Sequence, residues 1–445
     1  MKTKRVLTAA LLFASLAGGA HCQQQSDARM GPTQTAASAA TTLTLRQAEA
    51  LALKNNPQIT IGKLKALIAL QFLREERSAL MPTAYVSLTA VDSNPGGRIA
   101  SGGLNNPILF PRAAAGASVS QLITDFGRTT NLLKSSEYQS KAEDENSAAT
   151  TAQILLTVDH AFFNALETKA LVRVAQETVN ARLVFGDKIS ALTKAKLRSD
   201  LDLSFARVEE ARAKLLLLEA RNNYGAAVAT LSAVLGYAGD QNLELLEEQS
   251  ELTAPPPEVS PLIAQARQQR PEIAALQNQV LAAEKNSSAE HDLWRPTISA
   301  LGVVGQAPVR DDHIPSWYGG VGVNVSIPLF NGFLYNARAK TADLQTDINR
   351  QKLTDFRNIL ARDVRIAWQD CNRAYERLSV TKQLEEQANL ALDLSQARYN
   401  LGLGSIVELT QAELQKTEAD IADTDARYQY RLTQLVLAYT MAAPK

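Results

Sequence analysis

The residues that could support chemistry in this sequence are few and widely separated. Its four histidines, at positions 21, 160, 291 and 313, show no metal-ligand spacing. No nucleophile elbow and no phosphate-binding glycine loop occurs. Acidic neighbours such as Glu209 and Glu210 are most simply a solvated helix face. We therefore predict that the protein is not an enzyme and holds neither a metal nor a cofactor.

The charge balance argues against a further class of protein. The 445 residues include 46 basic and 46 acidic side chains, so the formal net charge is zero. Electrostatic binding of nucleic acid needs a basic surface, so we expect no nucleic acid partner. Aromatic residues make up only 6% of a chain that is rich in Ala, Leu, Gln and Glu. This composition favours long helices, and the length favours more than one structural unit.

The N-terminus has the pattern of an export signal. Three basic residues precede the apolar run 7–16, and small residues follow up to Ala20. We predict a signal peptide at 1–20 and a flexible segment at 21–42. Cys22 follows His21, whereas a lipidated cysteine directly follows a small residue. Two alternatives stay open: cleavage after Ala20 with Cys22 unmodified, or lipidation of Cys22.

The rest of the chain contains one unit twice. Pro57 and Pro271 lie 214 positions apart, and so do Pro82 and Pro296. Beyond position 120 the offset between matching residues becomes 206 and stays constant. Such a register predicts an internal duplication. We assign a first repeat to 43–236, a linker to 237–260 and a second repeat to 261–445.

Long stretches without proline and with few glycines predict long helices. No proline occurs from 113 to 254 or from 329 to 443. Apolar residues follow a 4,3,4 spacing, for example Ile154, Val158, Ala161 and Ala165, which predicts packing between neighbouring helices. An ordinary amphipathic bundle has the same spacing and remains the alternative. The predicted helices are 58–81, 128–194 and 201–236 in the first repeat, and 272–295, 333–400 and 406–441 in the second.

Between these helices, each repeat contains a pattern of period two. Val321, Val323, Val325 and Ile327 alternate with small or polar residues. We predict one β-hairpin per repeat, at about 83–124 and about 297–328. Strands of about 9 to 11 residues fit a transmembrane β-strand. Aromatic residues near the strand ends fit girdles at a membrane interface: Trp294, Trp317, Tyr318, Phe330 and Phe333.

A membrane location of these hairpins would require several chains. Four strands cannot enclose a lumen, and an open strand edge is not tolerated in lipid. The hairpin loops 92–113 and 306–317 fit the longer external loops of membrane barrels. The alternative is the edge of a soluble sandwich. That fold needs a second sheet, for which the sequence offers no further strands.

The signal peptide, the duplicated unit and the proline-free arms together resemble the TolC-type outer-membrane efflux protein family, the outer-membrane factors of tripartite efflux and type I secretion. The resemblance covers nearly all of the chain from about Thr42. Its most specific element is "RYNLGLGSIVEL" at 398–409, with "LRSDLDLSFA" at 197–206 as the first-repeat counterpart. It implies a mainly α fold with a transmembrane β part, and it puts the linker 237–260 in the equatorial region of the helices.

The resemblance also implies an assembly and a function. Three chains would form a homotrimer with a 12-stranded β-barrel and a 12-helix α-barrel. Expected partners are a periplasmic adaptor (membrane fusion) protein, an inner-membrane pump and outer-membrane lipid. The expected function is a passive exit duct in the bacterial outer membrane, with a long periplasmic extension gated at its helical tips. The alternative is a periplasmic coiled-coil structural or adaptor protein without a channel.

The family's docking tips correspond to the two turns between long helices. Gly402 and Gly404 permit a tight turn with positive φ. The first repeat has Lys196 and Arg198 at these positions, so we predict that the two turns are not equivalent. The residues that the resemblance assigns to adaptor docking are Leu197, Arg198, Ser199, Asp200, Gly402, Leu403, Gly404 and Ser405.

The same resemblance assigns a periplasmic gate. Glu408 matches an acidic ring residue, Asp202 is its first-repeat equivalent, and Tyr399 matches a tyrosine of the links that close the gate. The alternative for the two acids is a helix N-terminal carboxylate favoured by the helix dipole. The sequence departs from the family at Gly404, where a basic residue is missing, and at Gln411, where an acid is missing. We therefore expect a different or weaker closing network.

Overall fold

The structure is a computed structural model that describes residues 41–91, 100–101, 104–105, 112–239, 243–247, 252–306 and 316–442. The predicted signal peptide, Cys22, and most of the segment 21–42 and of the two hairpin loops lie outside the described residues. Residues from Thr42 onward form one compact unit.

In the part of the chain that the structure describes, four α-helices in the first half are followed by four in the same order in the second half. The long helices α3 and α7 have 67 residues each, and α4 and α8 have 35 residues each, as a duplication predicts. The helices are α1 (Leu45–Asn55), α2 (Pro57–Ser78), α3 (Arg128–Lys194), α4 (Asp200–Val234), α5 (Ser260–Gln269), α6 (Pro271–His291), α7 (Leu334–Asn400) and α8 (Ile406–Thr440).

The sequence patterns missed several short elements. The helices α1 and α5 were not predicted, and neither were the strands β1 (Thr41–Leu43) and β6 (Leu243–Leu245), which pair with each other. The end of the segment predicted to be flexible and part of the linker are therefore structured. The helix predicted at 272–295 ends earlier, and a 3₁₀ turn (Asp292–Trp294) follows it. Arg295 is extended because it precedes Pro296.

The two prolines that begin α2 and α6 are each preceded by a residue that ties the repeat together. Asn56 accepts a hydrogen bond from the Gln58 N–H, and its Nδ2 donates to the Val234 carbonyl at 2.8 Å. In the second repeat, Arg270 Nη1 donates to the Tyr439 carbonyl, also at 2.8 Å. Each contact satisfies a carbonyl near the C-terminal end of the last helix of its repeat. The residue between the two helices on either side of each proline thus contacts the end of the last helix of its repeat.

The two β-hairpins join into one antiparallel sheet in the order β2–β5–β7–β8. Its strands are β2 (Thr83–Val91), β5 (Arg112–Thr124), β7 (Thr297–Gln306) and β8 (Trp317–Ser326). A short pair, β3 (Ala100–Ser101) with β4 (Leu104–Asn105), lies between β2 and β5 in the chain. Within the described part of the chain, the outer edges of β2 and β8 have no strand partner.

The registers of the two hairpins repeat the sequence offsets. Thr83 lies opposite Ser120 in the first hairpin, and Thr297 lies opposite Ser326 in the second. These pairs are related by the offsets of 214 and 206 in the sequence. The duplication therefore extends to the pairing of individual residues.

One face of the sheet is apolar and the other is small or polar. The strand registers place Val86, Leu88, Val304, Val321 and Val323 on the same face. All of them are exposed in the single chain, with Val321 at 95% and Leu88 at 82%. The opposite face presents mainly serine, threonine, asparagine and glycine.

The two aromatic residues at the start of β8 point to opposite faces because neighbouring strand residues alternate. Trp317 is on the apolar face. Tyr318 is on the other face, over Gly305 and Gly116, and a Cβ at Gly116 would come within 2.8 Å of its hydroxyl. The two aromatics therefore do not share one face of the sheet, and their place in an interfacial girdle stays a prediction.

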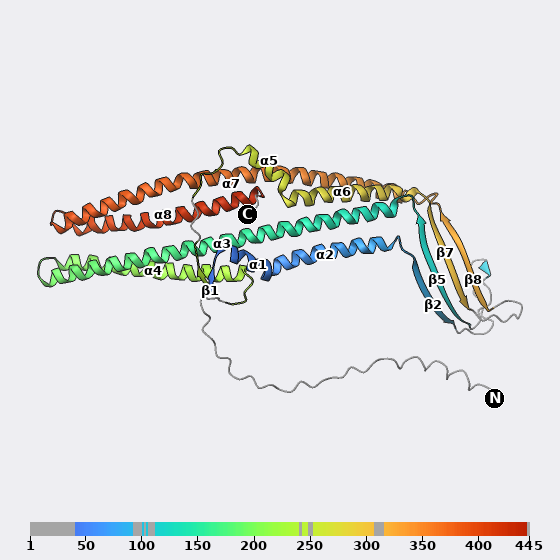
Figure 1. Cartoon of the computed structure of the whole chain (residues 1–445), viewed down its shortest axis with the longest axis horizontal. Helices are drawn as coiled ribbons and strands as arrows, with labels where there is room; N and C mark the ends of the chain where they lie inside the picture. Colours follow the sequence, from blue (N-terminus) through green and yellow to red (C-terminus); the bar gives the residue numbers. More distant parts are fainter. Residues whose placement is uncertain are drawn as a thin grey trace, which may run out of the picture. The chain divides into compact units, whose positions relative to one another are not determined.

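All long helices run along one axis, with the sheet at one end and the two helix–helix turns at the other (Figure 1). Near the sheet the packing order is α2, α3, α6, α7, and near the turns it is α4, α3, α8, α7. The helix α3 is thus the central member. In the described part of the chain, no helix is long and apolar enough to span a membrane. Cys371 is a free, buried thiol in the apolar cluster between α5, α6, α7 and α8.

Candidate functional site

The first turn, between α3 and α4, ends one helix and caps the next. The Leu197 N–H donates to the Leu192 carbonyl at 2.9 Å, and Lys196 has a φ of 62°. The Ser199 hydroxyl accepts the Asp202 N–H at 3.1 Å, and the Asp202 carboxylate accepts the Ser199 N–H at 3.4 Å. This reciprocal pair is a capping box.

The second turn has the same backbone. The Leu403 N–H donates to the Arg398 carbonyl at 2.9 Å, Gly402 has a φ of 73°, and the Ser405 hydroxyl accepts the Glu408 N–H at 3.1 Å. The prediction of two non-equivalent turns is therefore wrong for the backbone. At Gly404 a Cβ would lie 3.1 Å from Glu408 Oε2, the end of a flexible side chain, and the first turn has Arg198 at the matching position.

The side chains are where the two turns differ. Arg198 of the first turn reaches the second hairpin, and its Nη2 donates to the Tyr399 carbonyl at 2.7 Å. The same guanidinium lies 4.2 Å from the centre of the Tyr399 ring, a cation–π contact. Lys188 adds a second link, with its Nζ 3.0 Å from Asn400 Oδ1. We call the contacts of Arg198 with Tyr399 and of Lys188 with Asn400 the tip clasp.

The basic residue of the second turn acts within its own hairpin. Arg398 Nε lies 3.1 Å from Glu408 Oε1, and its Nη2 lies 3.2 Å from the Leu403 carbonyl oxygen. This pair is exposed, so it contributes little to stability by itself. It does fix the direction of the Glu408 carboxylate.

Tyr399 is the buried centre of the tip. Its side chain is only 2% exposed and packs in an apolar cluster with Ile189, Ala206, Ile406 and Leu409. Among the described residues of the single chain, its hydroxyl has no hydrogen-bond partner. Burial, and secondarily the nearby Asp202 carboxylate, raise the pKa of this phenol. The cluster draws residues from both hairpins, so Tyr399 joins them by packing as well as through the tip clasp.

The two acids assigned to the gate occupy the first turns of α4 and α8. In the single chain the Asp202 carboxylate accepts the Ser199 N–H at the start of its own helix, which fits the alternative of a carboxylate favoured by the helix dipole, whereas the Glu408 carboxylate contacts Arg398 at the end of α7. The Asp202 carboxylate lies close enough to Tyr399 to raise the pKa of its phenol, and Arg198 contacts Tyr399 directly. Glu408 contacts Arg398, the residue before Tyr399.

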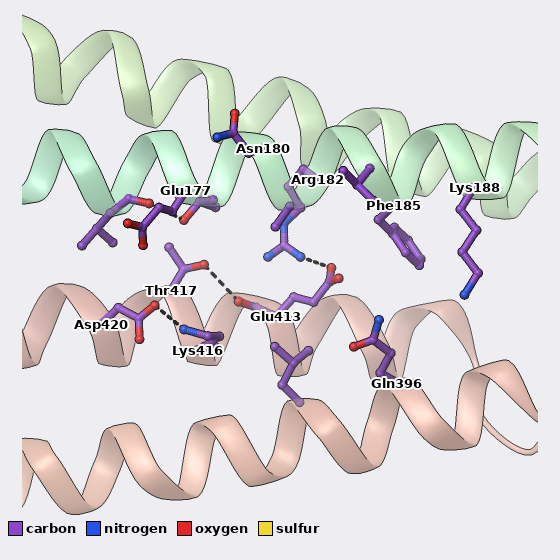
Figure 2. Close-up of a pocket in the computed structure, with 15 residues that line it drawn as sticks. Glu177, Asn180, Arg182, Phe185, Lys188, Gln396, Glu413, Lys416, Thr417 and Asp420 are labelled. Atoms are coloured by element: carbon purple, nitrogen blue, oxygen red, sulfur yellow. Dashed lines mark hydrogen bonds and ion pairs between the residues drawn. The ribbon is translucent and has the colours of Figure 1, made fainter.

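A second polar link lies further from the turns and was not predicted. Arg182 on α3 points toward Glu413 on α8 and forms an ion pair with it (Figure 2). The two residues are 7% and 8% exposed. Burial raises the pKa of Glu413, and the Arg182 charge opposes that shift. The sequence does contain a signal for this link. Four buried residues on one face of α3 follow a 3,4,3 spacing: Val179, Arg182, Gly186 and Ile189. Arg182 therefore places a charged side chain on an otherwise uncharged, buried helix face.

Beside this ion pair, the two hairpins leave a cavity of about 600 Å³. Figure 2 shows the long side chains of Lys188 and Gln396 on opposite walls, and Lys416 in contact with Asp420 on α8. The walls are mixed in charge and include both apolar and polar side chains. Among the described residues, no group of three histidine, cysteine or acidic side chains could hold a metal ion.

The fold and the linked turns define a class: duplicated helical-hairpin proteins whose two β-hairpins form one sheet at the far end. Comparison with known proteins gives the family. The sequence profile described as outer membrane efflux protein matches residues 48–237 and 262–442, so the chain belongs to the outer membrane efflux protein family. It is an outer-membrane efflux channel of a bacterium, with a periplasmic extension, and not an enzyme. The predictions of the family, of an outer-membrane efflux channel and of the location are confirmed.

Individual relatives agree with this assignment. The outer membrane protein TolC of Salmonella enteritidis is 24% identical over 420 residues, covering 89% of this chain and 83% of TolC. Among solved structures, CusC has a TM-score of 0.77 at 18% identity, covering 89% of this chain and 91% of CusC. The open-state MtrE channel of Neisseria gonorrhoeae has a TM-score of 0.74 at 18% identity, covering 89% and 88%. These structural likenesses support the fold.

Proposed function

We propose that three copies of this chain form the channel, with a 12-stranded barrel in the outer membrane and a 12-helix tunnel in the periplasm. The sheet carries this proposal. Its four strands leave two edges that have no partner among the described residues, and one of its faces is apolar and exposed. Unpaired backbone groups in lipid cost several kcal/mol each. Closure of the sheet on neighbouring copies removes that cost and directs the valine-rich face to lipid.

The contact between the two repeats within one chain serves as a template for the contact between copies. In the chain, Ser120 of β5 lies opposite Leu301 of β7. Applying the offsets of 206 and 214 places Ser326 of β8 opposite Ser87 in β2 of the neighbouring copy. The helices follow the same rule, since α3 packs on α6 within the chain and α7 would pack on α2 of the neighbouring copy. The exposed apolar residues of α2 support this contact: Ile61, Leu64, Leu67, Ile68 and Phe72.

We assign the gate to the tip end, where the tunnel meets the periplasm. The tip clasp holds the second hairpin against the first, and Arg198 takes the place of the basic residue that is missing at Gly404. Three copies of Asp202 and Glu408 near the three-fold axis would form a ring of negative potential. Release of the tip clasp would let the second hairpin move away from the axis.

The partners in this proposal are a periplasmic adaptor protein and an inner-membrane pump. The turns offer apolar side chains to an adaptor, because Leu197, Leu401 and Leu403 are 69%, 75% and 68% exposed. The channel itself contributes a passive path, and the pump supplies the energy and selects the cargo.

Purified protein in planar bilayers tests this architecture. The detergent-extracted protein is expected to have the mass of three chains and to conduct ions in bilayers. A stable monomer without conductance would overturn the trimeric channel and would favour the alternative of a coiled-coil protein that spans no membrane.

A further inference from the structure

Three exposed apolar side chains of the second β-hairpin lie on the polar face of the sheet. They are Leu301 and Val303 of β7 and Tyr318 of β8. The strand register pairs Tyr318 with Gly305, and Val303 and Leu301 follow at steps of two residues along β7. All three side chains therefore point to the same side of the sheet. From position 301 to position 305, at about 3.3 Å per residue, they form a line about 13 Å long that runs along the strands.

Two glycines let the Tyr318 ring lie against the sheet. Gly305 is opposite Tyr318, and Gly116 of β5 is opposite Gly305, so the three residues form one row across three strands. A Cβ on Gly305 would lie 2.5 Å from Tyr318 Cζ, and a Cβ on Gly116 would lie 2.8 Å from the Tyr318 hydroxyl oxygen. The ring therefore extends from β8 across β7 toward β5, over backbone that carries no side chains. One face of the ring covers this backbone, and the other face is turned away from the sheet.

The neighbouring strand β8 leaves open space beside the two aliphatic side chains. Gly322 lies opposite Leu301, and Gly320 lies opposite Val303. Among the described residues, a Cβ on Gly322 would meet no atom within 4 Å, and a Cβ on Gly320 would meet only Val303 Cγ2, at 3.8 Å. The side chains of β7 can therefore be reached from the side of β8 as well as from above the sheet. We call Leu301, Val303 and Tyr318 the apolar track.

The first β-hairpin has hydroxyl residues at the positions of the two aliphatic side chains. The offset of 214 relates Leu301 to Ser87 and Val303 to Thr89. Both hairpins have the same register at these positions. A hairpin of this register therefore forms with either pair of residues, so the fold does not require the apolar pair. Apolar side chains that stay exposed to water also gain nothing from the hydrophobic effect.

We propose that the apolar track contacts the apolar or aromatic part of amphipathic organic molecules as they leave through the channel. The chain is an efflux channel, so its cargo passes along the inner wall. The polar face of the sheet is that wall in the proposed barrel, and in this step the inference rests on the proposed function. Tyr318 then lies inside the channel and not in an interfacial girdle. The neighbours of the track on β5, Ser118 and Ser120, are uncharged, so the contact selects for apolar surface and for groups that bind a ring face.

Block of the channel current in planar bilayers tests the apolar track. The probe is benzyltrimethylammonium, added on the side of the β-hairpin loops. Tetramethylammonium has the same charge without the aromatic group and serves as the comparison. Leu301→Ser combined with Val303→Thr copies the first hairpin, and it is expected to weaken block by the benzyl probe about three- to tenfold and to leave block by tetramethylammonium unchanged. Equal block by the benzyl probe in wild type and in this variant would overturn the proposal.

Three further variants sharpen this comparison. Ser87→Leu combined with Thr89→Val gives the first hairpin the same aliphatic pair and is expected to strengthen block by the benzyl probe. Tyr318→Ala should weaken it, because the exposed ring face is lost. Tyr85 is an exposed aromatic residue of β2 on the same face, separated from Val303 by Ser118, so Tyr85→Ala is the control and should block as wild type does. An equal loss of block in Tyr85→Ala and Tyr318→Ala would contradict a site at the track.

Cysteine labelling distinguishes a failure of the track from a failure of the proposed barrel. Val303 and Val304 are neighbours on β7 and point to opposite faces of the sheet. A charged thiol reagent that does not cross lipid should label Val303→Cys in outer-membrane preparations and should not label Val304→Cys above the level of wild type, which has two native cysteines. The reverse pattern would overturn the orientation of the proposed barrel and the track with it. Labelling of Val303→Cys together with unchanged block in Leu301→Ser with Val303→Thr would overturn the track alone.

Discussion

Arg198 of the first helical turn contacts Tyr399 of the second hairpin twice: its guanidinium donates to the Tyr399 carbonyl at 2.7 Å and lies 4.2 Å from the centre of the ring. The backbone of the two turns is the same, but only the first turn reaches across to the other hairpin. The two repeats therefore differ here in their side chains and not in their backbone. This difference produces the tip clasp within a single chain.

Arg198→Ala is expected to favour the open tip. A hydrogen bond from a charged group and a partly exposed cation–π contact together contribute about 1.5–3 kcal/mol, so the open state should gain about tenfold or more. The measurement is the open fraction in planar bilayers. Tyr399→Phe is the matched control, because it keeps the carbonyl and the ring. An unchanged open fraction in Arg198→Ala would show that the tip clasp does not hold the gate.

Each of the two turns has one residue with positive φ. At these positions a change to glycine and a change to alanine are expected to have opposite effects on the stability of the turn. Lys196 has a φ of 62° and Gly402 a φ of 73°. A side chain in this region costs about 1–2 kcal/mol. Lys196→Gly should stabilise the first turn and Gly402→Ala should destabilise the second by a similar amount. Hydrogen exchange of the turn amides measures both, and a faster exchange in Lys196→Gly would contradict the shared backbone.

Removing one partner of the Arg182–Glu413 ion pair is expected to lower the free energy of unfolding. Replacing both partners with apolar residues is expected to lower it much less. Arg182→Met alone leaves a buried carboxylate, which costs about 3–5 kcal/mol. Arg182→Met combined with Glu413→Leu should restore most of the unfolding free energy, because packed apolar residues can replace a buried pair. A double-mutant cycle on thermal or denaturant unfolding gives the coupling. Additive effects of the two changes would mean that the residues do not interact.

The acidic residues at the tips predict ion preference. Asp202→Ala combined with Glu408→Ala should lower the preference for cations over anions, because it removes the negative potential near the axis. The reversal potential in a salt gradient measures this preference. Glu177→Ala, away from the turns, serves as the control. Equal reversal potentials for wild type and the double variant would leave the two acids as helix caps only.

The ends of the long helices follow closely from sequence. Segments without proline and with little glycine contain few residues that end a helix. The ends of α3 and α7 are therefore set by turn residues such as Gly127 and Gly402. The helices α1 and α5 were not predicted, because each is short and only one residue separates its end from a proline. The strands β1 and β6 have three residues each, too few for a period to show.

The site was only partly predictable for a related reason. Residues of the turns could be placed from their motif, but contacts between hairpins depend on how α3 and α8 pack. The Arg198–Tyr399 contact joins positions 201 residues apart, and the Arg182–Glu413 ion pair joins α3 to α8. A charge inside an apolar seam, as at Arg182, is the one local signal that pointed to such a link. Tyr318 shows the same limit in the sheet, since only the strand register fixes its face.

Cross-linking between copies tests the trimeric channel most directly. The repeat offsets place Ser326 opposite Ser87 of the neighbouring copy, so Ser87→Cys combined with Ser326→Cys should form a disulfide between chains. The predicted result under oxidation is a covalent trimer on a denaturing gel, reversed by reductant, with each single variant giving no trimer. Two observations together would contradict the account. The variant with Ser87→Cys and Ser326→Cys would remain a monomer, and the variant with Thr89→Cys and Ser326→Cys, shifted by two residues along β2, would link the chains.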